Sequence, residues 1–280
     1  MSKTLTTNAV TQFDAQVKQA YQGFGMLRGT VRLRTGVVGS SHRFPKMSKG
    51  TATSRVPQTD VVPMNIVHSS QTATLDDWNA PEFTDIFDQQ KVNYDERSEL
   101  AEVIGGAITR REDQIILDAI DAGSTSLTVS ISTGGTSTGM NTAKFRAAKF
   151  ELDNKGVPKG KNDRTFVMSS KALQQMLGDT DADTFDKNAI KMLVDGEIQT
   201  WLGFHVIDME DRDEGGLPVS SSVRTNYAYH RQAVGHAVGI EFRTEVNYIP
   251  VKTSWLANGL FAAGAVAIDV AGIVEVFSQE

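Results

Sequence analysis

The chain holds a long segment, Val38 to Leu75, that has too few apolar side chains to fold on its own. Of its 38 residues ten are bulky and apolar and eleven are Ser or Thr, which excludes a core within the segment. Segments of this length without a core are usually functional or disordered. The stretches TATSRV (51–56) and TATL (72–75) favour strands, but an isolated two-stranded hairpin is marginally stable in water. We therefore predict that this segment, the arm, becomes ordered against another copy of the chain.

A long amphipathic helix is predicted soon after the arm, from Asp95 to Ala122. Apolar residues such as Leu100, Ile104 and Ile108 recur there at helical spacing. At 1.5 Å per residue such a helix is about 42 Å long. The pair Gly105–Gly106 costs roughly 1 kcal/mol per glycine relative to alanine. We expect a bend, or the close approach of a neighbouring element, at this pair.

The rest of the sequence predicts an α+β chain with an α/β domain inserted in its middle. A strand is expected at Thr30–Leu33. The middle predicts strand 126–132, helix Thr142–Leu152, strand Thr165–Met168, helices Lys171–Leu177 and Lys187–Leu193, and strands His205–Asp208 and Thr225–His230. The C-terminal part predicts strands at Ile240–Tyr248, Leu260–Ile268 and Ile273–Phe277. Because these last strands have no helix of their own, we expect the long helix to cover them, so that 77–139 and 236–280 form one domain.

The composition excludes several classes of protein. The chain has no cysteine, so it has neither disulfides nor thiolate metal sites. The N-terminus lacks the apolar core of a signal peptide. The most apolar run, Gly259 to Ile268, is far shorter than the roughly 20 residues that span a bilayer. We expect a soluble protein without a membrane partner.

Charge is distributed unevenly along the chain. Residues 1–57 carry nine of the 28 basic residues and one of the 34 acidic residues, which leaves a net charge of −14 on the remainder. The basic part could be a solvated tail, could lie across acidic surfaces of neighbouring subunits, or could face nucleic acid. We favour neighbouring subunits, because the body of the same chain supplies an acidic partner. An acidic body is also a poor general surface for DNA phosphates.

The sequence Gly134–Gly139 has the G-x-x-x-x-G spacing of a phosphate-binding loop between a predicted strand and helix. Met140 and Asn141 stand where such a loop needs Lys and Ser or Thr, so both functional parts are missing. A nucleotide-binding α/β enzyme is an alternative that rests on this loop alone. The histidines show no metal-binding spacing, and no G-x-S-x-G elbow occurs. We predict a protein that is not an enzyme, with no catalytic residue, metal site or cofactor.

Four blocks of sequence, in order, closely resemble the major capsid proteins of tailed bacteriophages. They are VRLRTGVVGSSHRFPKMSKGTATSR, QTDVVPMNIVHSSQTATLDDWNAPEFTDIFD, DERSELAEVIGGAITRREDQIILDAI and GIEFRTEVNYIPVKTSWLANGLFAAGAVAIDVAGIVEV. The resemblance spans residues from about 25 to 277 and implies the Hong Kong 97 fold. It maps an N-terminal arm to 1–37, an extended loop to 38–76, a peripheral domain with a spine helix (95–122) to 77–139 and 236–280, and an axial domain to 140–235.

The resemblance implies a shell protein that assembles as pentamers and hexamers into an icosahedral head. That head is assembled in the bacterial host cytoplasm and encloses double-stranded DNA without reading its sequence. Because little chain precedes the loop, we expect a separate scaffolding protein, together with a portal and, as an open alternative, a decoration protein. An encapsulin-like nanocompartment shell is the alternative within the same fold.

Residues of the arm and of the spine helix are the candidate inter-subunit contacts. On the arm these are Arg43, Lys46, Lys49, Arg55, Asp60 and Met64. The basic members are expected to face acidic groups of a neighbour, with Glu96, Glu99 and Asp113 on the spine helix as candidates. Each exposed ion pair contributes only about 0–1 kcal/mol, but repetition over many copies makes small contributions sufficient.

Overall fold

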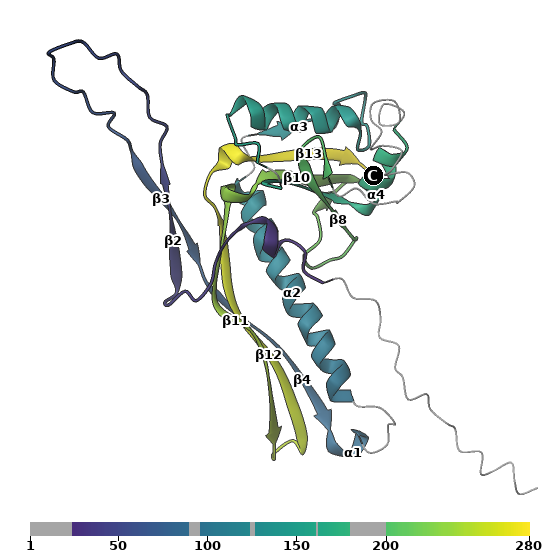
Figure 1. The fold of residues 1–280 in the computed structure, drawn as a ribbon. Helices are drawn as coiled ribbons and strands as arrows, with labels where there is room; N and C mark the ends of the chain where they lie inside the picture. Colours follow the sequence, from purple (N-terminus) through teal and green to yellow (C-terminus); the bar gives the residue numbers. More distant parts are fainter. Residues whose placement is uncertain (1–23, 90–95, 124–126, 161, 180–199) are drawn as a thin grey trace, which may run out of the picture.

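The computed structural model describes residues 24–89, 96–123, 127–160, 162–179 and 200–280. Within these residues the chain forms an elongated sheet backed by one long helix, an α/β part at one end, and a projecting hairpin (Figure 1). Among them, no helix is both long and apolar enough to cross a membrane.

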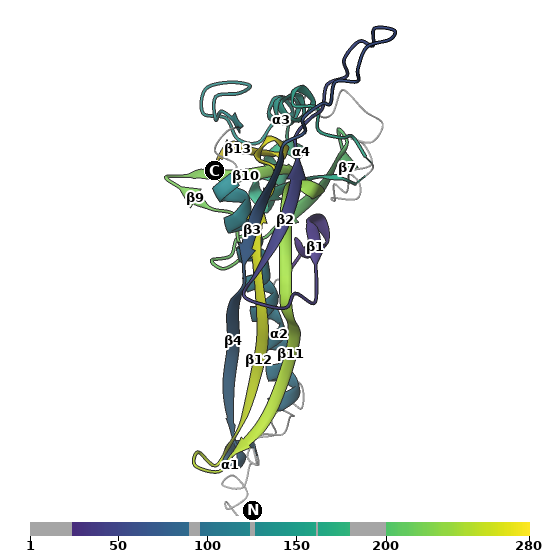
Figure 2. The same cartoon turned by 90° about the vertical axis from the view of Figure 1, so that its left-hand side faces the viewer.

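The elongated sheet has the strand order β1-β11-β12-β4. Its strands are β1 (Arg32–Arg34), β11 (Val234–Ile249), β12 (Ser254–Ala267) and β4 (Asp76–Asp85). β1 is parallel to β11, and the other pairs are antiparallel. Figure 2 shows β4, β12 and β11 running side by side along the helix α2 (Glu96–Gly123), with the short helix α1 (Ile86–Gln89) at their far end.

The helix α2 confirms the predicted long helix to within one residue at each end. Ile108 packs with Phe261 and Val238, so α2 covers the sheet as the sequence predicted. One close approach is at Gly259 of the sheet, where a Cβ would be 2.5 Å from Cγ2 of Ile104. A Cβ on Gly105 would meet the Phe242 ring at 3.9 Å, an ordinary contact. The predicted close approach is therefore not found at Gly105. Close contacts between α2 and the sheet lie instead at Gly259 and at Gly123, where a Cβ would be 2.3 Å from Cβ of Ala267.

The α/β part is built on a seven-stranded sheet in the order β5-β13-β10-β6-β8-β7, with β9 paired to β10. Its strands are β5 (Thr128–Val129), β6 (Arg164–Ser169), β7 (Thr200–Trp201), β8 (Phe204–Met209), β9 (Val219–Ser220), β10 (Val223–His230) and β13 (Ile273–Gln279). Helices α3 (Thr142–Asn154) and α4 (Ser170–Leu177) pack on it. Phe145 of α3 stacks on Phe166 of β6 with ring centroids 3.9 Å apart, in the centre of this core.

Several predicted elements differ in the structure. Strand β13 pairs with β10 and β5, so residues 273–279 belong to the α/β sheet rather than to the elongated one. Residues 51–56 form no strand, and of the described residues 127–132 only the two of β5 form one. The strand expected at Thr30–Leu33 is β1 (Arg32–Arg34), which starts two residues later because a 3₁₀ turn spans Arg28–Thr30. The predicted helix Lys187–Leu193 lies outside the described residues.

Candidate inter-subunit surface

The base of the arm is a hairpin of β2 (Ser41–Met47) and β3 (His68–Thr74). The strands pair in antiparallel register from Ser41↔Thr74 to Met47↔His68. Phe44 and Ala73 are the buried residues of this hairpin, and they pack against Ala237 and Ile268 of the body. A two-stranded hairpin with one small apolar contact is thus fixed to the chain only at its base.

Two glycines of the elongated sheet make room for this base. A Cβ on Gly264 would lie only 1.8 Å from the carbonyl oxygen of Thr74. A Cβ on Gly235 would lie 2.7 Å from Cε2 of the Phe44 ring. No side chain fits at either position without moving the hairpin, because Cβ contacts below 3.0 Å are not tolerated. The backbone of the sheet therefore sets where the arm leaves the body.

The cations at the base contact the body of their own chain. Lys46 Nζ lies 2.8 Å from Oδ1 of Asp269. Lys49 Nζ donates a hydrogen bond to the carbonyl oxygen of Lys155, at 3.0 Å. These two predicted inter-subunit residues are thus engaged within the chain, whereas Arg43 is exposed on the hairpin.

The distal part of the arm, residues 49–66, projects away from the body in both views (Figures 1 and 2). All of these residues are exposed. Within this fully described stretch one backbone–backbone hydrogen bond forms, from Thr59 N to Val56 O at 3.4 Å. Its exposed large apolar side chains are Val56, Val61, Val62, Met64 and Ile66. The predicted contact residues Arg55 and Asp60 lie on the same stretch and are also exposed.

The spine-helix acids are placed very differently from one another. Asp113 is buried: its carboxylate accepts hydrogen bonds from the amides of Met26 and Leu27 and pairs with Arg212 at 2.8 Å. Burial raises the pKa of this carboxyl, and the hydrogen bonds from Leu27, Met26 and Arg212 oppose the rise. Asp113 consequently offers no exposed carboxylate to another chain, which corrects its expected role.

The other two candidate acids lie near the start of α2. Glu99 is half-buried, and the side chain of Glu96 lies outside the described residues. Glu102, which the sequence argument did not select, is exposed on the same helix. Helical spacing could have predicted that Glu102 is exposed, because it lies off the buried face of the helix that contains Ile104 and Ile108.

Strand β11 supplies a second exposed surface that the sequence argument missed. Residues Glu241 to Tyr248 are all exposed, and the alternating apolar residues Ile240, Phe242, Val246 and Tyr248 are 38% to 47% exposed. β1 covers its outer edge only at Gly235–Ala237, and among the described residues 240–249 pair on one side alone, with β12. An unpaired strand edge of this kind is a template for pairing with another chain.

The glycine-rich loop is closed by its own chain. The Nζ of buried Lys144 donates hydrogen bonds to the carbonyl oxygens of Thr138 (2.5 Å) and Gly139 (2.9 Å). Asn141 caps α3 by accepting a hydrogen bond from the amide of Lys144, at 2.9 Å. Desolvation lowers the pKa of Lys144 to about 8. The lysine thus binds the carbonyl oxygens of the loop. The loop leads into the capped start of α3 and does not form a phosphate-binding site.

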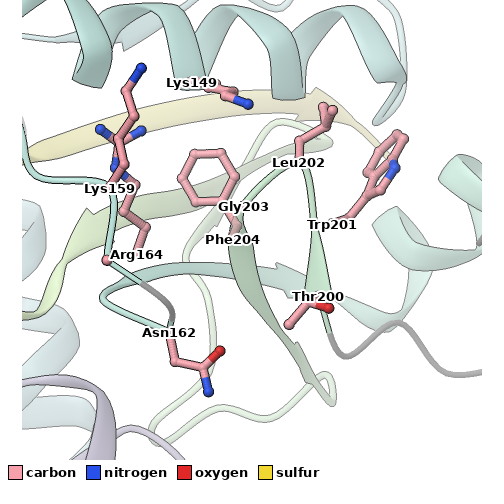
Figure 3. Close-up of a pocket in the computed structure, with 10 residues that line it drawn as sticks. Lys149, Lys159, Asn162, Arg164, Thr200, Trp201, Leu202, Gly203 and Phe204 are labelled. Atoms are coloured by element: carbon pink, nitrogen blue, oxygen red, sulfur yellow. The ribbon is translucent and has the colours of Figure 1, made fainter.

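A pocket of about 450 Å³ lies beside α3, lined by Lys149, Lys159, Arg164, Trp201 and Phe204 among others (Figure 3). The Arg164 guanidinium is almost fully buried and bonds Asp153 and the carbonyl oxygens of Val157 and Pro158. Lys159 pairs with the same Asp153 carboxylate at 2.9 Å. The positive charges of Arg164 and Lys159 are therefore both paired within the chain, where they stabilise the connection between α3 and β6. Among the described residues, no group of His, Cys, Asp or Glu is placed to hold a metal ion.

Comparisons with known proteins agree with this architecture. Residues 5–280 match the phage capsid protein family. The capsid of the cyanophage P-SCSP1u matches with a TM-score of 0.74 at 17% identity, over 98% of this chain and 94% of that one. The capsid of the Helicobacter pylori bacteriophage KHP30 matches with a TM-score of 0.79 at 14% identity, over 100% and 98%. The capsid of a native GTA particle matches with a TM-score of 0.66 at 15% identity, over 98% of this chain and 96% of that one.

No curated protein sequence matches the chain. The structural likenesses establish the Hong Kong 97-like fold, and the family match covers nearly the whole sequence. With its elongated sheet, its long helix and its projecting arm, the chain belongs to the phage capsid protein family.

Proposed function

We propose that this chain is the major shell subunit of an icosahedral phage head, assembled as pentamers and hexamers around double-stranded DNA in the bacterial host cytoplasm. The proposal rests mainly on the exposure of the distal part of the arm. Residues 49–66 are exposed throughout, and almost all of their backbone groups have no backbone hydrogen-bond partner in the part of the chain that the structure describes. Such a segment gains its hydrogen bonds and buries its apolar side chains only against another molecule.

The physical basis of assembly is strand edges that add to other chains. An identical contact repeated between identical subunits generates closed rings when its rotation closes. Each Val or Met of the arm that is buried in the contact contributes roughly 1.5–3 kcal/mol to the free energy of association. This exceeds the contribution of an exposed ion pair. We therefore expect Val61, Val62 and Met64 to dominate the contact, and Arg43 and Arg55 to fix its register by pairing with acids such as Glu96, Glu99 and Glu102.

We assign each of the two sheets to a different part of the shell. We propose that the α/β sheet with residues 140–235 and β13 forms the axial part around capsomer centres. The elongated sheet and α2 then form the peripheral part that the arm of a neighbour crosses. The separate scaffolding protein, portal and decoration protein are expectations that rest on family resemblance.

Deletion of Ser48–Met64 tests the proposal. The segment is exposed and leaves Phe44 and the hairpin base in place, so the shortened chain should fold with an unchanged melting temperature. Expressed under conditions in which the full chain gives shells, it should give only small species by electron microscopy and sedimentation. Normal particles from the deletion variant would refute the role of the arm. Uniform small shells from the full chain alone would favour the nanocompartment.

A further inference from the structure

The outer edge of β11 is open along its C-terminal part. Nearer the α/β part, this edge is covered by β1 and by the amide of Val37, which donates to the carbonyl oxygen of Val238 at 3.1 Å. Beyond that point, residues 239–249 have β12 as their only partner strand among the described residues. Figure 2 shows this stretch at the margin of the elongated sheet. The free edge therefore extends over residues 239–249, and its midpoint is Thr244.

The opposite edge of the same sheet, that of β4, is protected against pairing. It carries Pro81, which has no amide to donate. It also carries four acidic residues, Asp76, Asp77, Glu82 and Asp85. Proline and charged side chains on an edge strand hinder pairing with another chain. β11 contains no proline, and from Arg243 onward its register with β12 is regular. Of the two edges, that of β11 is therefore the one suited to strand addition.

Side chains on the free edge alternate between the two faces of the sheet. Phe242 faces α2, because a Cβ on Gly105 would meet its ring at 3.9 Å. Thr244 shares this face, since it lies opposite Gly259, whose Cβ would approach Ile104 of α2. The apolar side chains on the α2 face are 38% to 47% exposed, and they are Phe242, Val246 and Tyr248. The other face carries Arg243, Glu245 and Asn247.

The sequence of this edge is complementary to itself in antiparallel register. When two copies pair with Thr244 opposite Thr244, Arg243 of each copy lies opposite Glu245 of the other. On the α2 face, Phe242 lies opposite Val246 in the same register. Opposite charges and aromatic–β-branched pairs stabilise antiparallel strands when they face each other. We propose that β11 pairs with β11 of a second copy across a two-fold axis at Thr244.

Charge opposes the neighbouring registers. The two-fold axis is perpendicular to the sheet, so a shift that keeps the faces matched moves the centre by one residue. Centring at Arg243 places the two Arg243 side chains opposite each other, and centring at Glu245 does the same with two carboxylates. Like charges directly opposite are destabilising. The register centred at Thr244 also uses the whole free edge, because Gly239 of each copy then lies opposite Ile249 of the other.

The pairing joins two four-stranded sheets into one continuous sheet, with α2 of both copies on the same face. An isologous contact of this kind links copies in pairs and does not generate rings. It uses neither the arm nor the α/β part. The inference therefore goes beyond the proposed function, because it assigns a second contact through which rings of subunits are joined to one another.

A single cysteine at the axis tests this contact, because the chain has no cysteine of its own. Thr244 is exposed, so Thr244→Cys should fold. Directly opposite Cβ atoms are about 4.5–5.5 Å apart in an antiparallel pair, close to the span of a disulfide. Oxidation of the full chain, in particles and at high concentration in solution, should give a covalent dimer on a denaturing gel and no larger species.

Two exposed positions provide matched controls. Asn247→Cys lies on the same edge, but its two copies are six positions apart along the paired strands, roughly 20 Å. Asn79→Cys lies on the protected edge of β4. Both variants should remain monomeric on the denaturing gel after the same oxidation.

Charge exchange tests the register. In the Thr244→Cys background, Arg243→Glu and Glu245→Arg each place like charges opposite each other. Each should reduce the yield of covalent dimer by about tenfold or more. The double exchange, Arg243→Glu with Glu245→Arg, restores opposite charges across the axis and should recover the yield.

Absence of the Thr244→Cys dimer, or an equal yield in either cysteine control, would overturn the proposal. Failure of the double exchange to recover the yield would overturn the register. A cross-link of Thr244→Cys that forms only when Thr53→Cys is also present would assign this edge to the arm of a neighbour instead. Shells without the dimer would remove this contact alone, whereas dimers without shells would count against the shell function alone.

Discussion

Nη2 of Arg212 lies 2.8 Å from Oδ2 of Asp113, and the two side chains are only 8% and 1% exposed. The same carboxylate accepts hydrogen bonds from the amides of Met26 (2.9 Å) and Leu27 (3.0 Å). One buried carboxylate thus joins the helix α2, the loop after β8 and the segment that precedes the arm.

Removal of Arg212 should therefore destabilise the fold strongly. In Arg212→Met the Asp113 carboxylate stays buried without its cation, which costs roughly 3–5 kcal/mol. Urea denaturation of the unassembled chain measures this loss. The matched control is Arg243→Met, because the Arg243–Glu245 pair is 60% and 46% exposed and should contribute at most about 1 kcal/mol. Equal losses in the two variants would contradict the role given to Asp113.

The position of the arm should depend on Gly264. Gly264→Ala places a Cβ against the Thr74 carbonyl oxygen, and such overpacking costs typically about 1–3 kcal/mol. We expect a lower unfolding free energy and faster tryptic cleavage at the base of the arm. Gly29→Ala is the control, because a Cβ there meets nothing within 4 Å; its effect should stay within about 0.5 kcal/mol. Unchanged cleavage in Gly264→Ala would show that the hairpin does not rest on β12.

Lys144 should make stability depend on alkaline pH. Its pKa is about 8 in the folded chain because of desolvation, and about 10.4 in the unfolded chain. Between these values the unfolded chain binds more protons, so the free energy of unfolding rises with pH, by up to about 3 kcal/mol. Below pH 8 this contribution is absent. Denaturation at several pH values should show the rise in the wild type and its loss in Lys144→Met. If the free energy of unfolding changed with pH in the same way in both proteins, the lowered pKa of Lys144 would be contradicted.

The apolar tip of the arm should matter for assembly and not for folding. Val61 is 87% exposed in the single chain, so Val61→Asp should change the unfolding free energy by no more than about 0.5 kcal/mol. In a contact that buries Val61, the same change removes roughly 1.5–3 kcal/mol per copy. The concentration at which particles form, measured by light scattering, should rise sharply. Val61→Ile should assemble normally; unchanged assembly of the aspartate variant would place Val61 outside the contact.

Local patterns in the sequence predicted the long helix well. The spacing of Leu100, Ile104 and Ile108 fixes one buried face, and α2 ends within one residue of its predicted bounds. The same spacing shows why Asp113 was misassigned. It precedes Ile116 and Leu117 by three and four residues, which places it on the buried face. An acidic side chain in an apolar stripe predicts a buried partner, but Arg212 is 99 residues away and no local pattern identifies it.

The pairing of strands was harder to predict. Residues 273–277 were recognised as a strand, but their partners depend on contacts distant in sequence, and β13 joins β10 and not β12. Likewise, Lys46 and Lys49 were predicted to contact a neighbouring subunit, whereas their contacts with Asp269 and Lys155 of the same chain arise only when the arm packs on the body.

Hydrogen exchange of residues 49–66 tests the central claim most directly, because their backbone groups, apart from Thr59 N and Val56 O, have no backbone partner among the described residues. In the unassembled protein these amides should exchange at nearly the rate of an unfolded peptide, and in assembled particles they should exchange at least about 100-fold more slowly. Equally fast exchange in both states would contradict an arm that is completed by a neighbouring molecule.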